Sequence, residues 1–210
     1  VSGSGKSTLI RECLTPLARA WVAKKKLDGC SAMHLEGMEG FRSVLEVDQT
    51  PIGRTPRSTP GTYVGFFDDI RKLFAQTSDA RMRGYLPGRF SFNSKSGRCP
   101  ACEGMGAIKM EMNFLPTTYT RCETCQGSRF NPQTLDVRYK GKNIAEVMHL
   151  SVAEALSFFE AVPKIRRALE ALRDTGLDYL KLGQTSPTLS GGEAQRLKLV
   201  THLLSGLKPD

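Results

Sequence analysis

The chain has 210 residues, of which 40% are hydrophobic and 24% are charged, so it can bury a core, and a disordered, collagenous or membrane-spanning protein is excluded. Its 30 lysines and arginines outweigh 21 acidic residues and give a net charge of +9. This surplus indicates a surface that binds nucleic acid, or simply a protein with a basic face.

Both ends of the sequence look interrupted. The chain opens on VSGSGKSTLI, without a methionine or a preceding strand, and a helical pattern near its end stops at KPD (208–210). We therefore expect an internal part of a longer protein. Neither a secretory leader nor an apolar run of about 18 residues is present, so we expect a cytoplasmic protein that does not enter a membrane.

The first motif, GSGKST, is most of a phosphate-binding P-loop and precedes a helix expected from residue 8 to about 26. The full pattern has one more glycine before Val1, which the sequence lacks. Its glycines let backbone N–H groups surround phosphates at the start of the helix. Lys6 would reach the β- and γ-phosphates, and Ser7 would ligate Mg²⁺. The alternative is a Gly/Ser-rich loop with a chance GKS.

Three further elements are expected before the cysteines. Residues 43–48 (SVLEVD) predict a short buried strand that leads into a Pro/Gly-rich loop, QTPIGRTPRSTPGTY. Helical signals return at residues 63–74. A basic run follows, and phosphate contacts from such residues would give sequence-independent affinity for DNA. The candidate DNA-binding residues are Arg89, Lys95, Arg98 and Arg121. The alternative is a solvated basic face.

Four of the six cysteines form two close pairs, CPAC and CETC, with 19 residues between the pairs. Two C-x₂-C pairs at this separation can place four thiolates around one Zn²⁺, and a closed four-sulfur set leaves no open position for catalysis. Each pair is followed by x-Gly, which lets backbone N–H groups turn toward the sulfurs. The predicted zinc ligands are Cys99, Cys102, Cys122 and Cys125. The alternatives are a redox dithiol and a free reduced pair.

The remaining elements follow from periodicity and capping. Alternating apolar residues predict a half-buried strand at 108–114 and another at 135–139, before a turn at 140–142. Ser151 and Glu154 form a capping box, which starts a helix that runs to about Val162. Pro163 suits the first turn of the next helix, whose Ile165, Leu169 and Leu172 share one face.

The last motif, TLSGGEAQRLKLV, opens a helix at Ser190, Gly191 and Gly192. Core-like residues follow at positions 194, 197 and 200 of this helix. Backbone N–H groups and a hydroxyl at a helix N-terminus suit a phosphate, so this is a second phosphate-facing surface, distant in sequence from the first. In isolation the motif is also compatible with an ordinary serine-capped helix.

The order of these motifs resembles an ABC-type ATPase: a P-loop, a glutamine-bearing loop (VDQTPIGRTPRS) and LSGGEAQR. The segments RCPACEGMG, CETCQGSRFNPQTLDVRYKGKNIAEV and LGQTSPTLSGGEAQRLKL are similar to the C-terminal half of the UvrA family. UvrA is the damage-sensing subunit of the bacterial nucleotide-excision repair excinuclease. The resemblance runs from residue 1 to about 204, and residues 31–41 match less well. A UvrA-like paralogue of drug self-resistance and a non-catalytic zinc-bearing interaction module are the alternatives.

The resemblance implies roles for the motif residues. In ABC ATPases, each nucleotide is held between the P-loop of one unit and the signature of another. The residues implied to hold ATP and Mg²⁺ in cis are Gly3, Ser4, Gly5, Lys6, Ser7 and Thr8. Ser190, Gly191 and Gly192 would contact the γ-phosphate held by the opposite unit. Gln49 matches the Q-loop position, which contacts Mg²⁺ and the attacking water and is the catalytic candidate.

The resemblance also implies partners and a fold. The partners are duplex DNA bound independently of sequence, a second copy of the full-length protein and a UvrB-like repair subunit. The fold is α/β, a partial ABC-type P-loop ATPase unit with an inserted α+β signature domain. Residues 1–50 would begin the nucleotide-binding unit, 51–185 would form the inserted domain with the zinc module at about 97–130, and 186–210 would form the signature helix. The family's Walker B strand and catalytic Glu follow that helix, so the chain alone is not expected to turn over ATP.

Overall fold

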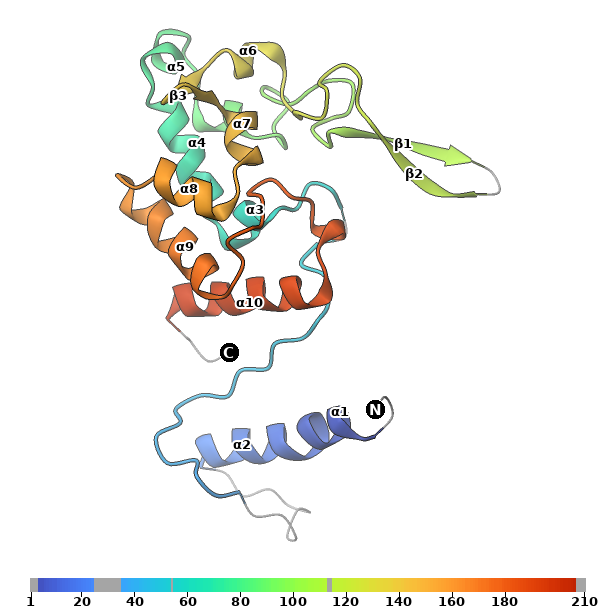
Figure 1. Cartoon of the computed structure of the whole chain (residues 1–210), viewed down its shortest axis with the longest axis vertical. Helices are drawn as coiled ribbons and strands as arrows, with labels where there is room; N and C mark the ends of the chain where they lie inside the picture. Colours follow the sequence, from blue (N-terminus) through green and yellow to red (C-terminus); the bar gives the residue numbers. More distant parts are fainter. Residues whose placement is uncertain (1–3, 25–34, 54, 113–114, 207–210) are drawn as a thin grey trace. The chain divides into compact units, whose positions relative to one another are not determined.

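The structure, a computed structural model, describes residues 4–24, 35–53, 55–112 and 115–206. It divides into two compact units (Figure 1). Unit 1 comprises residues 1–48 and 205–210, and unit 2 comprises residues 49–204. Among the described residues, no helix is both long and apolar enough to cross a membrane.

Unit 1 is built on one helical segment that follows the P-loop sequence. It comprises α1 (Lys6–Thr8), the π-helical η1 (Leu9–Leu14) and α2 (Thr15–Val22). Gly5 precedes it with a φ of 78°, a left-handed conformation that glycine adopts without steric cost. The helix therefore begins two residues before the predicted start and ends at Val22. Residues 25–34, which include the end of the predicted helix, lie outside the described residues.

The prediction of a strand at residues 43–48 is wrong. These residues are irregular, and Leu45 is exposed. Glu46 instead contacts the helix through Arg11 at 3.5 Å and Arg19 at 3.6 Å. A strand needs a neighbour for its backbone N–H and C=O groups, and none of the described residues supplies a ladder for this segment.

Unit 2 combines short helices with two small antiparallel sheets. Its helices are α3 (Pro60–Val64), α4 (Phe67–Ala75), α5 (Ser78–Met82), α6 (Pro132–Leu135), α7 (Ile144–His149), α8 (Val152–Phe158), α9 (Pro163–Asp174) and α10 (Gly191–Ser205), with 3₁₀ turns η2 (Pro87–Phe90) and η3 (Ser186–Thr188). Strand β1 (Ala107–Met112) pairs with β2 (Leu115–Arg121), and β3 (Arg138–Tyr139) pairs with β4 (Lys142–Asn143). The β1–β2 hairpin extends away from the helices of this unit (Figure 1).

A single apolar core holds the helices of unit 2 together. Its largest fully buried side chains are Phe67, Phe74, Phe90, Phe92, Phe130, Phe159, Ile70, Ile144, Ile165, Leu169, Leu172 and Leu177. Phe92 and Phe130 belong to the segments on either side of the cysteine pairs, and their ring centroids lie 6.1 Å apart. Phe92 also contacts Phe67 of α4, at 5.8 Å between centroids. The core therefore anchors both chain segments that lead to the cysteines.

Capping decides where several helices of unit 2 begin. The predicted Ser151–Glu154 capping box is confirmed at α8, because the Glu154 N–H donates to Ser151 Oγ at 3.2 Å and the Ser151 N–H donates to Glu154 Oε2 at 2.7 Å. The helix ends at Phe158 rather than Val162. The next helix starts at Pro163 as predicted, and its three predicted core residues are fully buried.

Local turn chemistry overrides two predictions from periodicity. The helix expected at 63–74 is interrupted at Gly65, which has a φ of 97°. The strand expected at 135–139 is reduced to Arg138–Tyr139 because Leu135 ends α6, which Asn131 caps by accepting the Thr134 N–H at 3.0 Å. The predicted turn at 140–142 does connect β3 and β4.

Truncation of the core should be far more costly than truncation of the same residue type at the surface. Leu169→Ala removes a fully buried side chain of α9, and we expect it to lower the free energy of unfolding by about 2–5 kcal/mol. Leu203→Ala, where the leucine is 45% exposed on α10, should change it by about 0.5 kcal/mol or less. Urea unfolding of both variants measures the difference, and equal losses would contradict this description of the core.

Candidate metal centre and signature helix

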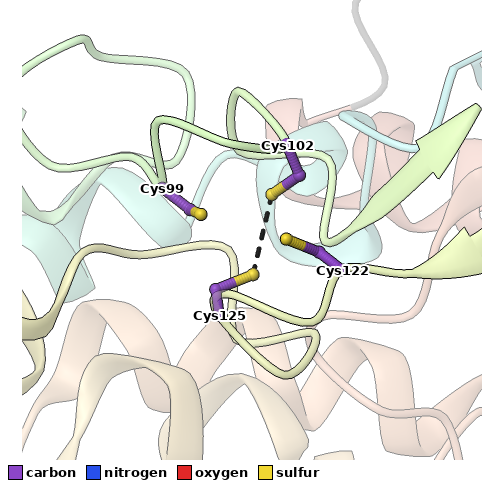
Figure 2. Close-up of side chains that lie close together, drawn as sticks. All are labelled: Cys99, Cys102, Cys122 and Cys125. Carbon is purple, nitrogen blue, oxygen red and sulfur yellow. Dashed lines mark hydrogen bonds between the residues drawn. The ribbon is translucent and has the colours of Figure 1, made fainter.

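The four paired cysteines converge on one point in unit 2 (Figure 2). Their sulfur atoms all lie within 4.8 Å of one another, and Cys102 Sγ lies 3.6 Å from Cys125 Sγ. A tetrahedral Zn²⁺ with Zn–S bonds of about 2.3 Å would separate its sulfurs by about 3.8 Å. A disulfide would bring two sulfurs to about 2.05 Å. The spacing therefore fits a tetrathiolate metal site and excludes a disulfide in this conformation.

The hairpin brings the two cysteine pairs together. Cys99 and Cys102 precede β1, and Cys122 and Cys125 follow β2, so the antiparallel register places them side by side. At the base of the hairpin the Cys122 N–H donates to the Gly106 carbonyl at 3.0 Å. Both chain segments meet again on the other side of the cluster.

This second pairing joins the segment before Cys99 to the segment after Cys125. The Cys99 N–H donates to the Arg129 carbonyl at 2.8 Å, and the Asn131 N–H donates to the Gly97 carbonyl at 3.0 Å. An added Cβ on Gly97 would lie 1.7 Å from the Arg89 carbonyl oxygen, so only glycine fits at this close approach. The cluster is thus enclosed by backbone pairing on both sides.

Each cysteine pair ends in the same left-handed turn. Glu103 and Gly104 follow the first pair with φ values of 51° and 83°, and Gln126 and Gly127 follow the second with values of 49° and 77°. Such turns direct backbone N–H groups inward. The Gly106 N–H donates to Cys102 Sγ at 3.3 Å. Donors of this kind favour the thiolate form, as a bound cation requires.

Burial and hydrogen bonding pull the cysteine pKa values in opposite directions. The backbone N–H of Cys125 lowers the pKa of the Cys122 thiol to about 7. Burial raises the pKa of the Cys102 thiol to about 12, despite the N–H group of Gly106. A cation among the four sulfurs would offset this cost of desolvation, so the donor set and its surroundings fit a divalent metal such as Zn²⁺.

The signature motif opens α10 with a capping box. The Ser190 N–H donates to Glu193 Oε2 at 2.7 Å, and the Glu193 N–H donates to Ser190 Oγ at 3.3 Å. The predicted core positions 194, 197 and 200 are buried. A Cβ added at Gly191 would lie 3.6 Å from Gln49 Cβ, so Gln49 lies against the start of α10.

The predicted P-loop residues lie in unit 1, at the start of its helix. Lys6 Nζ donates to Ser4 Oγ at 2.9 Å, and the residues from Ser4 to Thr8 are exposed. Gly3, the first glycine of the predicted set, lies outside the described residues. The start of the helix at this motif is therefore exposed to solvent, and the Lys6 side chain points back toward Ser4.

Comparison with known proteins gives a consistent result. No protein-family model matches the chain. It is 55% identical to UvrABC system protein A of Oceanobacillus iheyensis over 203 residues and 55% identical to that of Haemophilus influenzae over 204 residues, each covering 97% of this chain. The crystal structure of UvrA2 from Deinococcus radiodurans matches with a TM-score of 0.80 and 48% identity, covering 98% of this chain and 24% of that one. The chain belongs to the UvrA family.

The predicted resemblance to UvrA and the mixed α and β fold are therefore confirmed. The chain spans about a fifth of the length of these curated relatives, 21% in Oceanobacillus iheyensis and 22% in Haemophilus influenzae.

The candidate DNA-binding residues of this UvrA chain lie in different environments. Arg89 donates to Thr134 Oγ1 at 3.0 Å and lies over the Tyr85 ring. Arg98 is mostly buried and pairs with Glu103 at 3.4 Å. The other two are more exposed: Arg121 donates to the Gln126 carbonyl, and Lys95 lines a groove of about 820 Å³ beside the metal centre.

Sequence reasoning missed the roles of two arginines. Arg129 is not among the candidate residues predicted from the sequence, and Arg57 is only part of the predicted Pro/Gly-rich loop. In the structure Arg129 is 7% exposed, and Arg57 donates to the Glu103 carbonyl at 3.2 Å. The x-Gly that follows each cysteine pair predicts a turn, but nothing in the sequence indicates which cation packs against it.

The metal centre gives a direct prediction. The purified UvrA chain should contain about one zinc per chain, because four converging thiolates bind Zn²⁺ tightly and without an open position. Replacement of any one of the four cysteines by serine should lower this content in elemental analysis. Cys13→Ser, in the helical segment of unit 1, should leave it unchanged. A folded wild-type chain without metal would contradict the assignment.

Proposed function

We propose that this chain is part of the DNA-damage-recognising ABC ATPase subunit of a cytoplasmic nucleotide-excision repair excinuclease. The observation that carries the proposal is 55% identity to UvrABC system protein A over 203 residues, which is 97% of the chain. This sustained identity to proteins of the UvrABC system favours repair over drug self-resistance or a non-catalytic interaction module.

In this proposal two surfaces bind nucleotide. The residues from Gly3 to Thr8 hold ATP and Mg²⁺ in cis, with Lys6 on the β- and γ-phosphates and Ser7 on the metal ion. Ser190, Gly191 and Gly192 contact the γ-phosphate held by an opposite unit. Support comes from α10, whose first turn has no side chain at two positions. An added Cβ on Gly192 would meet no atom within 4 Å, so a phosphate can approach the backbone there.

Gln49 is the proposed link between the nucleotide and the rest of unit 2. Its side chain lies beside Gly191, and Thr50 next to it accepts a hydrogen bond from Lys198 Nζ at 2.6 Å. A side chain at this place can sense whether the signature contacts a phosphate. ATP supplies the γ-phosphate and its charge, and this chain supplies positioning and electrostatic stabilisation.

The four cysteines have a structural role in the proposal. Cys99, Cys102, Cys122 and Cys125 hold Zn²⁺, which joins the hairpin to the core. The surface around this centre binds duplex DNA through phosphate contacts, which suits a sensor that detects shape and deformability rather than base identity. The full-length protein forms a homodimer and binds a UvrB-like subunit.

The 210-residue chain should bind ATP without appreciable hydrolysis. The family's activating carboxylate follows the signature helix and is not among these residues, so water activation is absent. The full-length parent should hydrolyse ATP, and Lys6→Ala should abolish that activity. Lys72→Ala, an exposed lysine of α4, is the matched control and should retain it. Robust turnover by the 210-residue chain would show that the catalytic groups lie elsewhere.

DNA binding should weaken steeply as salt rises, because phosphate contacts release counterions. Lys95→Ala should lower affinity equally on random and lesion-bearing duplexes and reduce the salt slope by about one. Lys164→Ala, an exposed lysine of α9, serves as the matched control and should behave as wild type. Fluorescence anisotropy over a salt series measures both quantities. An unchanged slope for Lys95→Ala would remove this residue from the DNA interface.

A further inference from the structure

Arg129 is a buried cation without an acidic partner. Its side chain lies over the Phe92 ring at 5.1 Å, and among the described residues no carboxylate forms an ion pair with it. Nη1 donates to the Pro56 carbonyl at 3.1 Å, and Nη2 donates to the Gly183 carbonyl at 3.4 Å. A buried charge is costly unless it is paired, so this guanidinium requires a source of negative charge.

The backbone of Arg129 is part of the metal centre. Its N–H lowers the pKa of the Cys125 thiol, and its carbonyl accepts the Cys99 N–H at 2.8 Å. It therefore contacts both cysteine pairs through its main chain. Its φ of 72° turns the chain sharply at this position. Any change in the arrangement of the two pairs must move the point from which the guanidinium extends.

The two carbonyls that Arg129 binds belong to segments that are themselves joined. The Ser186 N–H and Oγ both donate to the Ser58 carbonyl, at 2.9 and 3.0 Å. Pro56 lies seven residues after Gln49, and Gly183 lies seven residues before Ser190. We name the pair of segments 55–58 and 183–186 the junction. Segment 55–58 follows Gln49, and segment 183–186 leads to the start of α10.

The other cysteine pair also contacts the junction. Arg57 Nη2 lies 3.2 Å from the Glu103 carbonyl and 3.4 Å from its carboxylate, directly after Cys102. The Arg57 Nε atom is buried and has no hydrogen-bond partner among the residues that the structure describes. Both turns that follow the cysteine pairs are therefore attached to the junction, one through Arg57 and one through Arg129.

A loaded metal centre supplies the missing counter-charge. Four thiolates and one Zn²⁺ leave two net negative charges beside the guanidinium. Burial lowers the pKa of Arg129 below its ordinary value, and the nearby Cys102 and Cys125 sulfurs oppose this change. The cluster and the arginine therefore stabilise each other when metal is bound.

We propose that Arg129 is a positioning residue through which metal in the four-cysteine centre fixes the junction, and with it the start of the signature helix. The inference rests on the metal site of the proposed function. Because coupling between two equilibria is reciprocal, metal binding should protect the junction from local opening. The hydrogen bonds of Arg129 to the junction should in turn raise the affinity for the metal.

The test compares Arg129→Met, Arg129→Lys and wild type, all as the full chain. Arg138→Met is the matched control, because Arg138 is a half-exposed arginine of the same unit that pairs with Glu146. Zinc affinity is measured by competition with a chromophoric chelator. Hydrogen–deuterium exchange of the junction is measured with zinc bound and after metal removal, and circular dichroism verifies the fold.

Metal removal from wild type should increase exchange in both segments of the junction. Arg129→Met should bind zinc about 10- to 100-fold more weakly, as expected for loss of an outer-shell partner. Its junction should exchange rapidly even with zinc bound. Arg129→Lys should regain part of the zinc affinity, because it keeps the positive charge. It should not restore the protection of the junction amides against exchange, because an ammonium lacks the planar fork that binds two carbonyls.

Wild-type zinc affinity together with wild-type protection in Arg129→Met would overturn the inference. So would a wild-type junction that stays equally protected after metal removal. In both cases zinc still binds, so the metal site itself stands. A chain that binds no zinc would instead overturn the metal site and the inference together.

Discussion

Four sulfur atoms within 4.8 Å of one another constrain everything around them in unit 2. Both cysteine pairs lie at the open end of the β1–β2 hairpin, one before β1 and one after β2, and a two-stranded hairpin is only marginally stable by itself. The cysteines and the backbone pairings on either side of them join this hairpin to the segments that carry Phe92 and Phe130. The apolar core then continues from these rings to α4, so the cluster and the core form one packed body.

The same body carries α10, the helix that begins at the proposed signature motif. Its first residues lie beside Gln49, while the loop that precedes it is tied to Ser58 and, through Arg129, to the cysteine turns. The P-loop belongs to the other unit. In the proposed function, the two phosphate-facing surfaces therefore belong to different units.

Much of this arrangement could be predicted from short-range signals. The cysteine spacing, the Ser151 capping box and the buried face of α9 each depend on residues within a few turns of one another. The predictions that failed concern features that depend on contacts distant in sequence or on a single residue. Residues 43–48 have strand-like composition but find no partner strand among the described residues, Gly65 divides a helix, and Asn131 starts α6 where alternation suggested a strand. The burial of Arg129 depends on carbonyls 73 and 54 residues away along the chain, which no local pattern reveals.

X-ray absorption at the zinc edge of the purified chain tests the metal centre most directly, because it reports the identity and distance of the ligands. A closed tetrathiolate predicts a first shell of about four sulfur atoms at about 2.3 Å, with no nitrogen or oxygen ligand. A shell that contains nitrogen or oxygen at about 2.0–2.1 Å would contradict a closed four-cysteine site.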